Sequence, residues 1–154
     1  MSLLGTIHLG LAVAAMAAGL AVALAPKGTR AHRRLGWTYL VAMLGLNATA
    51  LMIYRLFGGF GPFHLAALMS LAALAGGMVP ARRRRPRGAW IRIHAYFMAW
   101  SYVGLLAAAA AEVLSRVPAS PFWGMVGVAT GIVFMAGSVV VNRYVPQALA
   151  RFRQ

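Results

Sequence analysis

The chain has 154 residues, 62 % of them hydrophobic, and its 15 lysines and arginines stand against a single acidic residue, which gives a formal net charge of +14. Soluble domains are about 45–50 % apolar, so this composition excludes an ordinary soluble domain and favours a membrane protein. The chain has no cysteine, which excludes a disulfide framework, zinc sites built on cysteine and thiol chemistry.

The hydrophobic residues form five blocks, at residues 3–25, 36–57, 63–79, 90–114 and 122–141. Each block is close to the ~17–25 residues that a helix needs to cross about 30 Å of hydrocarbon. Five such blocks leave almost no room for a soluble domain. We therefore predict an all-α integral membrane protein with five transmembrane helices, folded as a single domain over residues 1–154.

The basic residues alternate with the hydrophobic blocks and predict the orientation of the chain. They gather after the first, third and fifth blocks, at Lys27, Arg30, Arg33 and Arg34, at residues 82–85 and Arg87, and at Arg143, Arg151 and Arg153. Short loops rich in lysine and arginine remain in the cytoplasm. We expect the N-terminus outside and the C-terminus inside, in the cytoplasmic (inner) membrane of a bacterium. The arginine run would meet anionic lipid headgroups, and since it lacks interleaved aromatic residues we expect no nucleic-acid binding.

Two halves of the chain follow the same order of residues. Each opens on His-Leu, at His8 or His64, and continues with a proline, a basic loop and a second histidine, His32 or His94. This order predicts two tandem helical hairpins, at about residues 3–57 and 63–116, which form a four-helix bundle around an axis along the membrane normal. Chance similarity between helices rich in alanine and leucine is the alternative.

The fifth helix, expected at about residues 121–142, is an addition to this bundle. Its Gly127 and Gly131 are four residues apart, a spacing that lets another helix approach closely. We expect this helix to contact a second copy of the chain or another membrane protein.

Glu112, the single acidic residue, lies toward the outer end of the fourth block. An ionisable side chain in a membrane helix is costly and usually faces the bundle interior or a partner. Together with His8 and His64, Glu112 provides two imidazoles and a carboxylate from three helices, a ligand set suited to zinc, iron or copper. The alternative is that Glu112 pairs with Arg116 and that the histidines bond to backbone carbonyls.

The same histidines allow a different cofactor. His8 and His64 could bind the two faces of an outer haem b, and His32 and His94 those of an inner one, which would carry electrons across the membrane. For His32 the alternative is a solvated residue at the interface. Asn47 and Thr49, in the second block, are expected to form interhelical hydrogen bonds or to line the outer site.

Four stretches, "IHL", "PKGTRAHRRLGWTYLVAM", "GPFHLAAL" and "HAYFMAWSYVGLLAAAAAEV", resemble a family of bacterial predicted membrane proteins, domain of unknown function 2306. The resemblance covers about residues 5–116 and implies a helical membrane bundle with no agreed activity. The histidine layout is also similar to that of dihaem transmembrane cytochromes b of the ascorbate-reducible type. The short spacing from His8 to His32 and the presence of Glu112 depart from that group.

Two classes of function are consistent with these features. The first is a redox or metal-dependent membrane protein that binds a metal ion or haem through histidines at two membrane levels. The second is a non-catalytic membrane component, such as an assembly factor or an accessory subunit of a larger complex.

Overall fold

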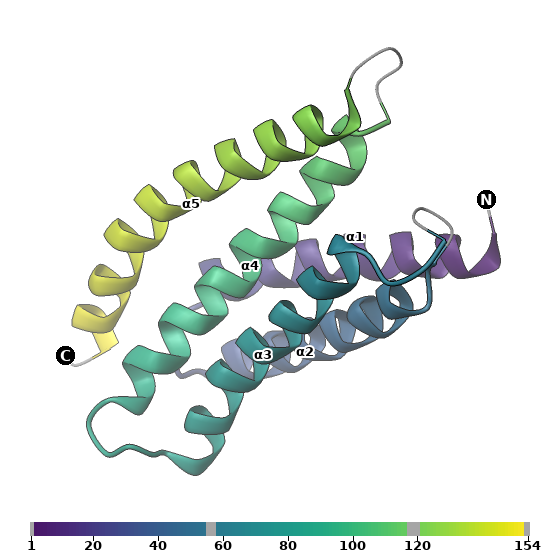
Figure 1. Cartoon of the computed structure of the whole chain (residues 1–154). Coiled ribbons are helices and arrows are strands. Elements are labelled where there is room, and N and C mark those ends of the chain that lie inside the picture. Colours follow the sequence, from purple (N-terminus) through teal and green to yellow (C-terminus); the bar gives the residue numbers. More distant parts are fainter. Residues whose placement is uncertain (1, 55–57, 117–120, 153–154) are drawn as a thin grey trace. The chain divides into compact units, whose positions relative to one another are not determined.

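A computed structural model describes residues 2–54, 58–116 and 121–152, which form five α-helices joined by loops (Figure 1). The helices are α1 (Leu3–Leu24), α2 (Arg30–Leu51), α3 (Pro62–Arg83), α4 (Trp90–Leu114) and α5 (Phe122–Phe152). The predicted all-α class is confirmed. By length and composition, four helices can cross a membrane: α1, α3, α4 and α5.

The chain divides into two compact units, Met1–Ala75 and Gly76–Gln154, and the boundary falls inside α3. We call them the N-terminal and the C-terminal unit. In the N-terminal unit α1 and α2 pack side by side, and in the C-terminal unit α4 packs along α5. The predicted repeat relates residues 3–57 to residues 63–116, and the second of these ranges belongs partly to each unit, so the repeat stays a prediction.

The second helix is the most polar of the five and falls short of the hydropathy of the other candidate spans. It starts at Arg30, six residues before the hydrophobic block that predicted it, because Thr29 caps the helix there by accepting a hydrogen bond from the His32 backbone N–H at 3.1 Å. It ends at Leu51, and residues 55–57 of the predicted block lie outside the described residues. The helix therefore begins before the hydrophobic block, and His32 lies in its first turn.

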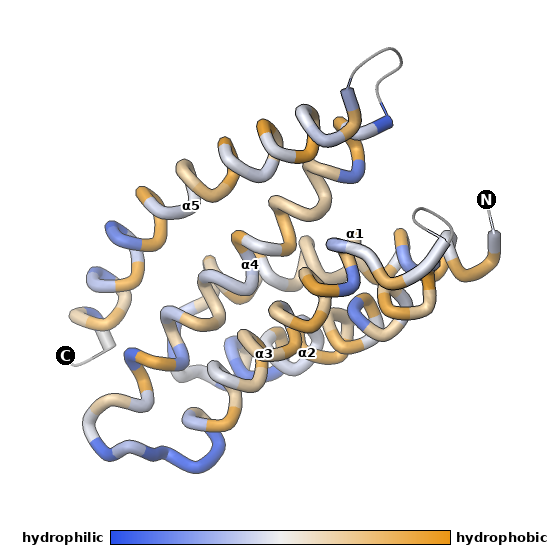
Figure 2. Tube along the Cα trace, viewed as in Figure 1, coloured by the Kyte–Doolittle hydropathy of each residue, from blue (hydrophilic) through white to orange (hydrophobic). Residues whose placement is uncertain are grey.

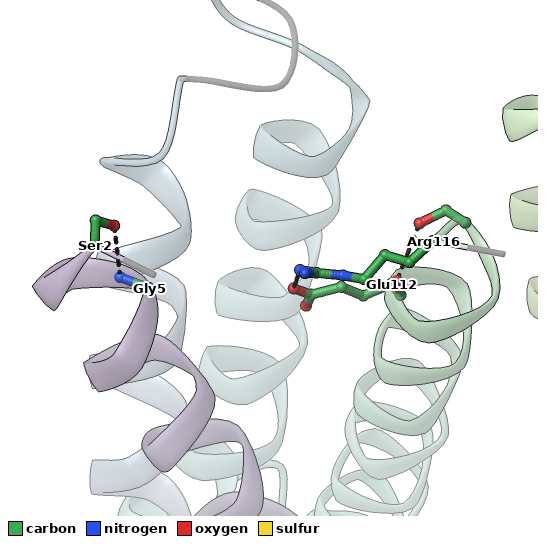
Figure 3. Close-up of polar contacts among 5 residues, drawn as sticks. Ser2, Gly5, Glu112 and Arg116 are labelled. Atoms are coloured by element: carbon green, nitrogen blue, oxygen red, sulfur yellow. Dashed lines mark hydrogen bonds and ion pairs between the residues drawn. The ribbon is translucent and has the colours of Figure 1, made fainter. Parts of the chain in front are cut away.

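The ends of α1 show how the sequence sets helix boundaries. At the start, the Ser2 hydroxyl accepts a hydrogen bond from the Gly5 backbone N–H at 3.2 Å (Figure 3). At the end, Lys27 donates to the carbonyl oxygens of Val22 and Ala23 at 2.8 and 2.7 Å. These bonds satisfy backbone groups that a helix terminus leaves unpaired.

Two helices continue past the predicted end of their hydrophobic block. α3 runs through Pro80 to Arg83 and α5 runs through Pro146 to Phe152. Hydropathy falls where the charged residues begin, but arginine is a good helix former, so the helical hydrogen bonds continue. The predicted end of the fifth helix at about residue 142 is therefore wrong, and Arg143 and Arg151 lie on α5 and not in a separate tail.

The core of the C-terminal unit lies between α4 and α5, which run antiparallel (Figure 1). It is built on Val103, Val141 and Val145. Gly137 allows the close approach, since a Cβ atom there would lie 2.5 Å from Cγ1 of Val103. The fifth helix is thus firmly packed on the fourth.

Candidate functional site

His8 bonds to the neighbouring helix through one ring nitrogen. Its Nδ1 lies 2.9 Å from the hydroxyl oxygen of Thr49 on α2. The Thr49 hydroxyl also lies 3.0 and 2.8 Å from the carbonyl oxygens of Gly45 and Leu46, which can only accept. Its one proton is directed to those carbonyls, so Thr49 accepts a hydrogen bond from the His8 Nδ1–H. The Nε2 atom of His8 therefore carries a lone pair.

His94 has the same tautomer for a different reason. Its Nδ1 lies 3.0 Å from the carbonyl oxygen of Gly77 on α3. A carbonyl oxygen has no proton to give, so Nδ1–H of His94 is the donor and Nε2 carries the lone pair. This bond requires α3 and α4 to lie close together.

Two consecutive glycines make that approach possible. A Cβ atom at Gly76 would lie 2.6 Å from the ring of Phe97, and one at Gly77 would lie 2.8 Å from Sδ of Met98. Real Cβ atoms essentially never come that near to another atom. A larger residue at either position would force Phe97 or Met98 to shift, which would disturb the close packing of α4 on α3 around His94.

His64 has the opposite tautomer. It is the third residue of α3, and its Nδ1 accepts a hydrogen bond from the Gly61 backbone N–H at 3.1 Å. This is the reach-back contact that Glu or Gln makes in a capping box. Because Nδ1 is the acceptor, the ring proton is on Nε2. His64 can coordinate a metal ion only if it gives up its bond to Gly61 or loses the Nε2 proton.

The Nε2–H group of His64 is buried. The residue is 2 % exposed, and Nε2 has no hydrogen-bond partner among the described residues. The rings of Tyr54 and Phe60 lie against the imidazole, with centroids 4.7 and 5.1 Å away. The Nε2–H group of His64 is therefore a buried donor without an acceptor among the described residues.

His32 occupies the same position in α2 that His64 occupies in α3. It is the third residue of its helix, three residues after the cap residue Thr29. The four histidines thus form two structural pairs. His8 and His94 link neighbouring helices, whereas His32 and His64 lie in the first turn of a helix. The second pair could have been found in the sequence, because Thr29 and Gly61 stand three residues before His32 and His64, the spacing of a helix cap.

Glu112 forms an ion pair with Arg116, four residues later on the same stretch of chain (Figure 3). The Arg116 guanidinium lies 2.5 Å from the carboxylate, and the side chains of Arg116 and Glu112 are 69 % and 50 % exposed. This ion pair was predicted from the sequence as the alternative to a metal site. An exposed i,i+4 pair contributes only about 0.2–0.5 kcal/mol.

Asn47 and Thr49 form the interhelical hydrogen bonds expected of them. Asn47 is 5 % exposed and donates to the carbonyl oxygen of Met43 at 2.7 Å and to the Ser70 hydroxyl on α3 at 3.1 Å. Thr49 bonds to His8 on α1. The polar side chains of α2 therefore find their partners on both neighbouring helices, and their polarity is not a sign of exposure to water.

The predicted ligand sets draw on both units. His8 and His64 belong to the N-terminal unit and Glu112 to the C-terminal unit, and His32 and His94 are divided in the same way. Across residues 2–54, 58–116 and 121–152, no three histidine, aspartate or glutamate residues form a group that could hold a metal ion. Convergence of His8, His64 and Glu112 remains a prediction.

Residues 5–150 match a protein family described as "Predicted membrane protein (DUF2306)". The match reaches well into α5, which the sequence resemblance over about residues 5–116 had left partly outside. Comparisons with curated proteins and with solved structures gave no match. The chain therefore belongs to the DUF2306 family and is a multi-pass membrane protein.

Proposed function

We propose that this protein binds a metal ion or a haem through histidines at two membrane levels, with His8 as the main ligand at the outer level and His94 at the inner level. The observation that carries the proposal is the direction of their ring protons. Each Nδ1–H group donates a hydrogen bond to an oxygen atom on a neighbouring helix, which leaves both Nε2 atoms with a free lone pair. Metal-binding histidines ordinarily have this arrangement, because the second hydrogen bond fixes the ring and raises its basicity.

At the outer level, His64 and Glu112 complete the site with His8. To bind the cofactor, each of these two side chains would break a weak interaction. Glu112 would leave an exposed pair with Arg116, and His64 would leave a single hydrogen bond to the Gly61 N–H. Imidazole and carboxylate ligands suit zinc, iron or copper, and a haem b would take the histidines alone.

At the inner level, His94 is the ligand with the favourable tautomer, and His32 is the second ligand of an inner haem b. A haem at each level would allow electrons to cross the membrane. In that case the axial ligands and the burial of each haem set its potential.

The orientation follows from the basic segments. We propose that all five helices cross the membrane, as two tandem hairpins in a four-helix bundle with α5 added. In this arrangement α2 is an interior helix whose polar groups are satisfied by α1 and α3. The N-terminus lies outside, and the loop that contains Arg84, Arg85 and Arg87 lies in the cytoplasm among anionic lipids.

A non-catalytic role, as an assembly factor or accessory subunit, is the second candidate. The observation that favours it is the open surface at two glycines of α5. A Cβ atom at Gly127 or at Gly131 would meet no atom within 4 Å. Such a surface suits close packing of a helix from a partner protein or from a second copy.

Metal analysis and an absorption spectrum of the protein, purified in detergent, distinguish the two candidates. The cofactor proposal expects a bound metal or a haem spectrum that is lost when His8 or His94 is replaced by alanine. A protein that purifies folded, without metal or haem, and takes up neither on addition contradicts it.

A further inference from the structure

Arginines from three segments gather at one end of the C-terminal unit. The last turn of α3 ends at Arg83, the loop that follows contains Arg84, Arg85 and Arg87, and the last turns of α5 carry Arg143 and Arg151. Figure 2 shows the loop as a largely hydrophilic segment, and hydrophilic stretches between hydrophobic ones in the last turns of α5, at the same end of α4. The sequence alone separates these segments by more than fifty residues.

Core packing sets the end of α5 beside the start of α4. Val145 belongs to the cluster against which Ala95 and Tyr96 pack, and Leu149 packs against the same cluster. Arg151 lies six residues after Val145, and Trp90 lies six residues before Tyr96. Since α4 and α5 are antiparallel (Figure 1), the last turn of α5, which contains Arg151, lies at the same end of the unit as the start of α4, where the arginine loop ends.

The chain cannot neutralise this charge with its own side chains. Its single carboxylate, Glu112, pairs with Arg116. Glu112 lies twenty residues after Arg92 in one helix, which corresponds to about 30 Å along the axis. Arg84, Arg85, Arg87, Arg143 and Arg151 are all exposed. Anions from outside the chain must therefore balance them.

The lengths of α4 and α5 allow these arginines to reach the level of lipid headgroups. α5 has 31 residues, about 46 Å, and α4 has 25 residues, about 37 Å. The hydrocarbon core is about 30 Å thick, with polar headgroup layers on either side. Both helices are therefore long enough to extend beyond the hydrocarbon, and an extension at this end would carry the arginines to the level of the phosphates.

We propose that this end of the C-terminal unit binds the phosphate of one anionic phospholipid between two groups of arginines. The loop arm is Arg84, Arg85 and Arg87, and the helix arm is Arg143 and Arg151. The guanidinium group matches phosphate geometry and binds it through two parallel hydrogen bonds. The proposal deepens the lipid contact proposed above and is independent of the histidines.

The test measures lipid binding to the full protein in detergent by native mass spectrometry, with phosphatidylglycerol and phosphatidylcholine as probes. Unchanged protein should retain phosphatidylglycerol in preference to phosphatidylcholine. A loop-arm variant, Arg84→Gln with Arg85→Gln and Arg87→Gln, and a helix-arm variant, Arg143→Gln with Arg151→Gln, should each weaken phosphatidylglycerol binding by about fivefold per arginine.

The combined variant tests whether the two arms bind the same lipid. If they do, unchanged protein retains one phosphatidylglycerol, each single-arm variant weakens the binding of that same lipid, and the combined variant weakens it further. Two retained lipids, of which each single-arm variant loses one and keeps the other, would overturn the proposal and indicate two independent charged surfaces.

Three further measurements complete the test. A control variant, Arg30→Gln with Arg33→Gln and Arg34→Gln, removes three charges from the N-terminal unit and should retain the bound lipid. An equal loss in this control would overturn the proposal, because net charge alone would then explain lipid binding. Displacement of the lipid by millimolar inorganic phosphate would also overturn it and would indicate a general anion site.

A lysine variant, Arg84→Lys with Arg85→Lys and Arg87→Lys, covers the case in which the glutamine variants fail to fold, because it keeps the charge. Loss of lipid from this folded variant would support the bidentate contact, whereas unchanged lipid binding would contradict it.

Discussion

His94 donates its Nδ1–H to the carbonyl oxygen of Gly77 at 3.0 Å, and this bond joins α4 to α3. It depends on the absence of side chains at two consecutive residues of α3. The same contact fixes the ring of His94 and keeps its Nε2 atom available as an acceptor. One helix–helix contact thus connects local packing with the chemistry that His94 can perform.

Replacing Gly76 with alanine should disturb this contact. The new Cβ atom would meet the Phe97 ring at 2.6 Å, and overpacking of this kind costs about 1–3 kcal/mol of unfolding free energy. Thermal unfolding in detergent measures the effect. Gly104→Ala on α4 is the matched control, since its Cβ atom would meet nothing within 4 Å, and it should leave stability unchanged or slightly raised. Equal destabilisation by both variants would contradict the close-approach interpretation.

The cap made by His64 predicts a rescue. His64→Ala leaves the Gly61 N–H without its acceptor and should cost about 0.5–2 kcal/mol, as loss of a helix cap does. His64→Gln restores an acceptor at the capping-box position and should recover most of this loss. Thermal unfolding of the two variants decides the matter. If glutamine is as destabilising as alanine, the cap is not the role of His64.

Thr49 should stabilise the packing of α1 on α2 through its hydroxyl group. Thr49→Val keeps the shape but removes the acceptor for His8, and interhelical hydrogen bonds in membranes contribute about 0.6–2 kcal/mol. Thr49→Ser keeps the hydroxyl and should retain most of the stability. Unfolding midpoints of the three proteins measure this contribution, and equal midpoints for valine and threonine would show that the bond contributes nothing.

The second helix gives the predicted topology its most direct test, because among the five described helices it alone falls below the hydropathy of a candidate span. Reporter fusions at Gly28, Gly59, Gly88 and the C-terminal Gln154 should read inside, outside, inside and inside. Matching signals at Gly28 and Gly59 would mean that α2 does not cross the membrane. A periplasmic signal at Gly88 or at Gln154 would overturn the predicted orientation.

Much of the fold follows from the sequence because hydropathy reports helix burial in lipid. Hydropathy predicted five helices, and the structure has five. The polar side chains of Asn47 and Thr49 predicted interhelical hydrogen bonds, which are confirmed. Hydropathy misplaced the end of α5, since it does not register a helix that continues through Pro146 into a charged segment.

The candidate site was harder to predict, because the position of each histidine's ring proton depends on the hydrogen bond that the ring makes. Sequence order grouped the histidines by membrane level. The hydrogen bonds separate His64, whose Nδ1 accepts from Gly61, from His8 and His94, whose Nδ1 atoms donate. Those contacts depend on backbone positions and on the distance between helices, which residue spacing alone does not specify.

The central claim is that the Nε2 atoms of His8 and His94 are the main ligand atoms for a cofactor. The most direct measurement is metal content together with the absorption spectrum of purified protein and of three variants: His8→Ala, His94→Ala and His64→Gln. We predict a bound metal or haem that decreases in the first two variants and persists at least in part in the third, since His8 remains in place. Binding that is unchanged in His8→Ala and in His94→Ala, or a folded protein that binds neither metal nor haem, would contradict the claim.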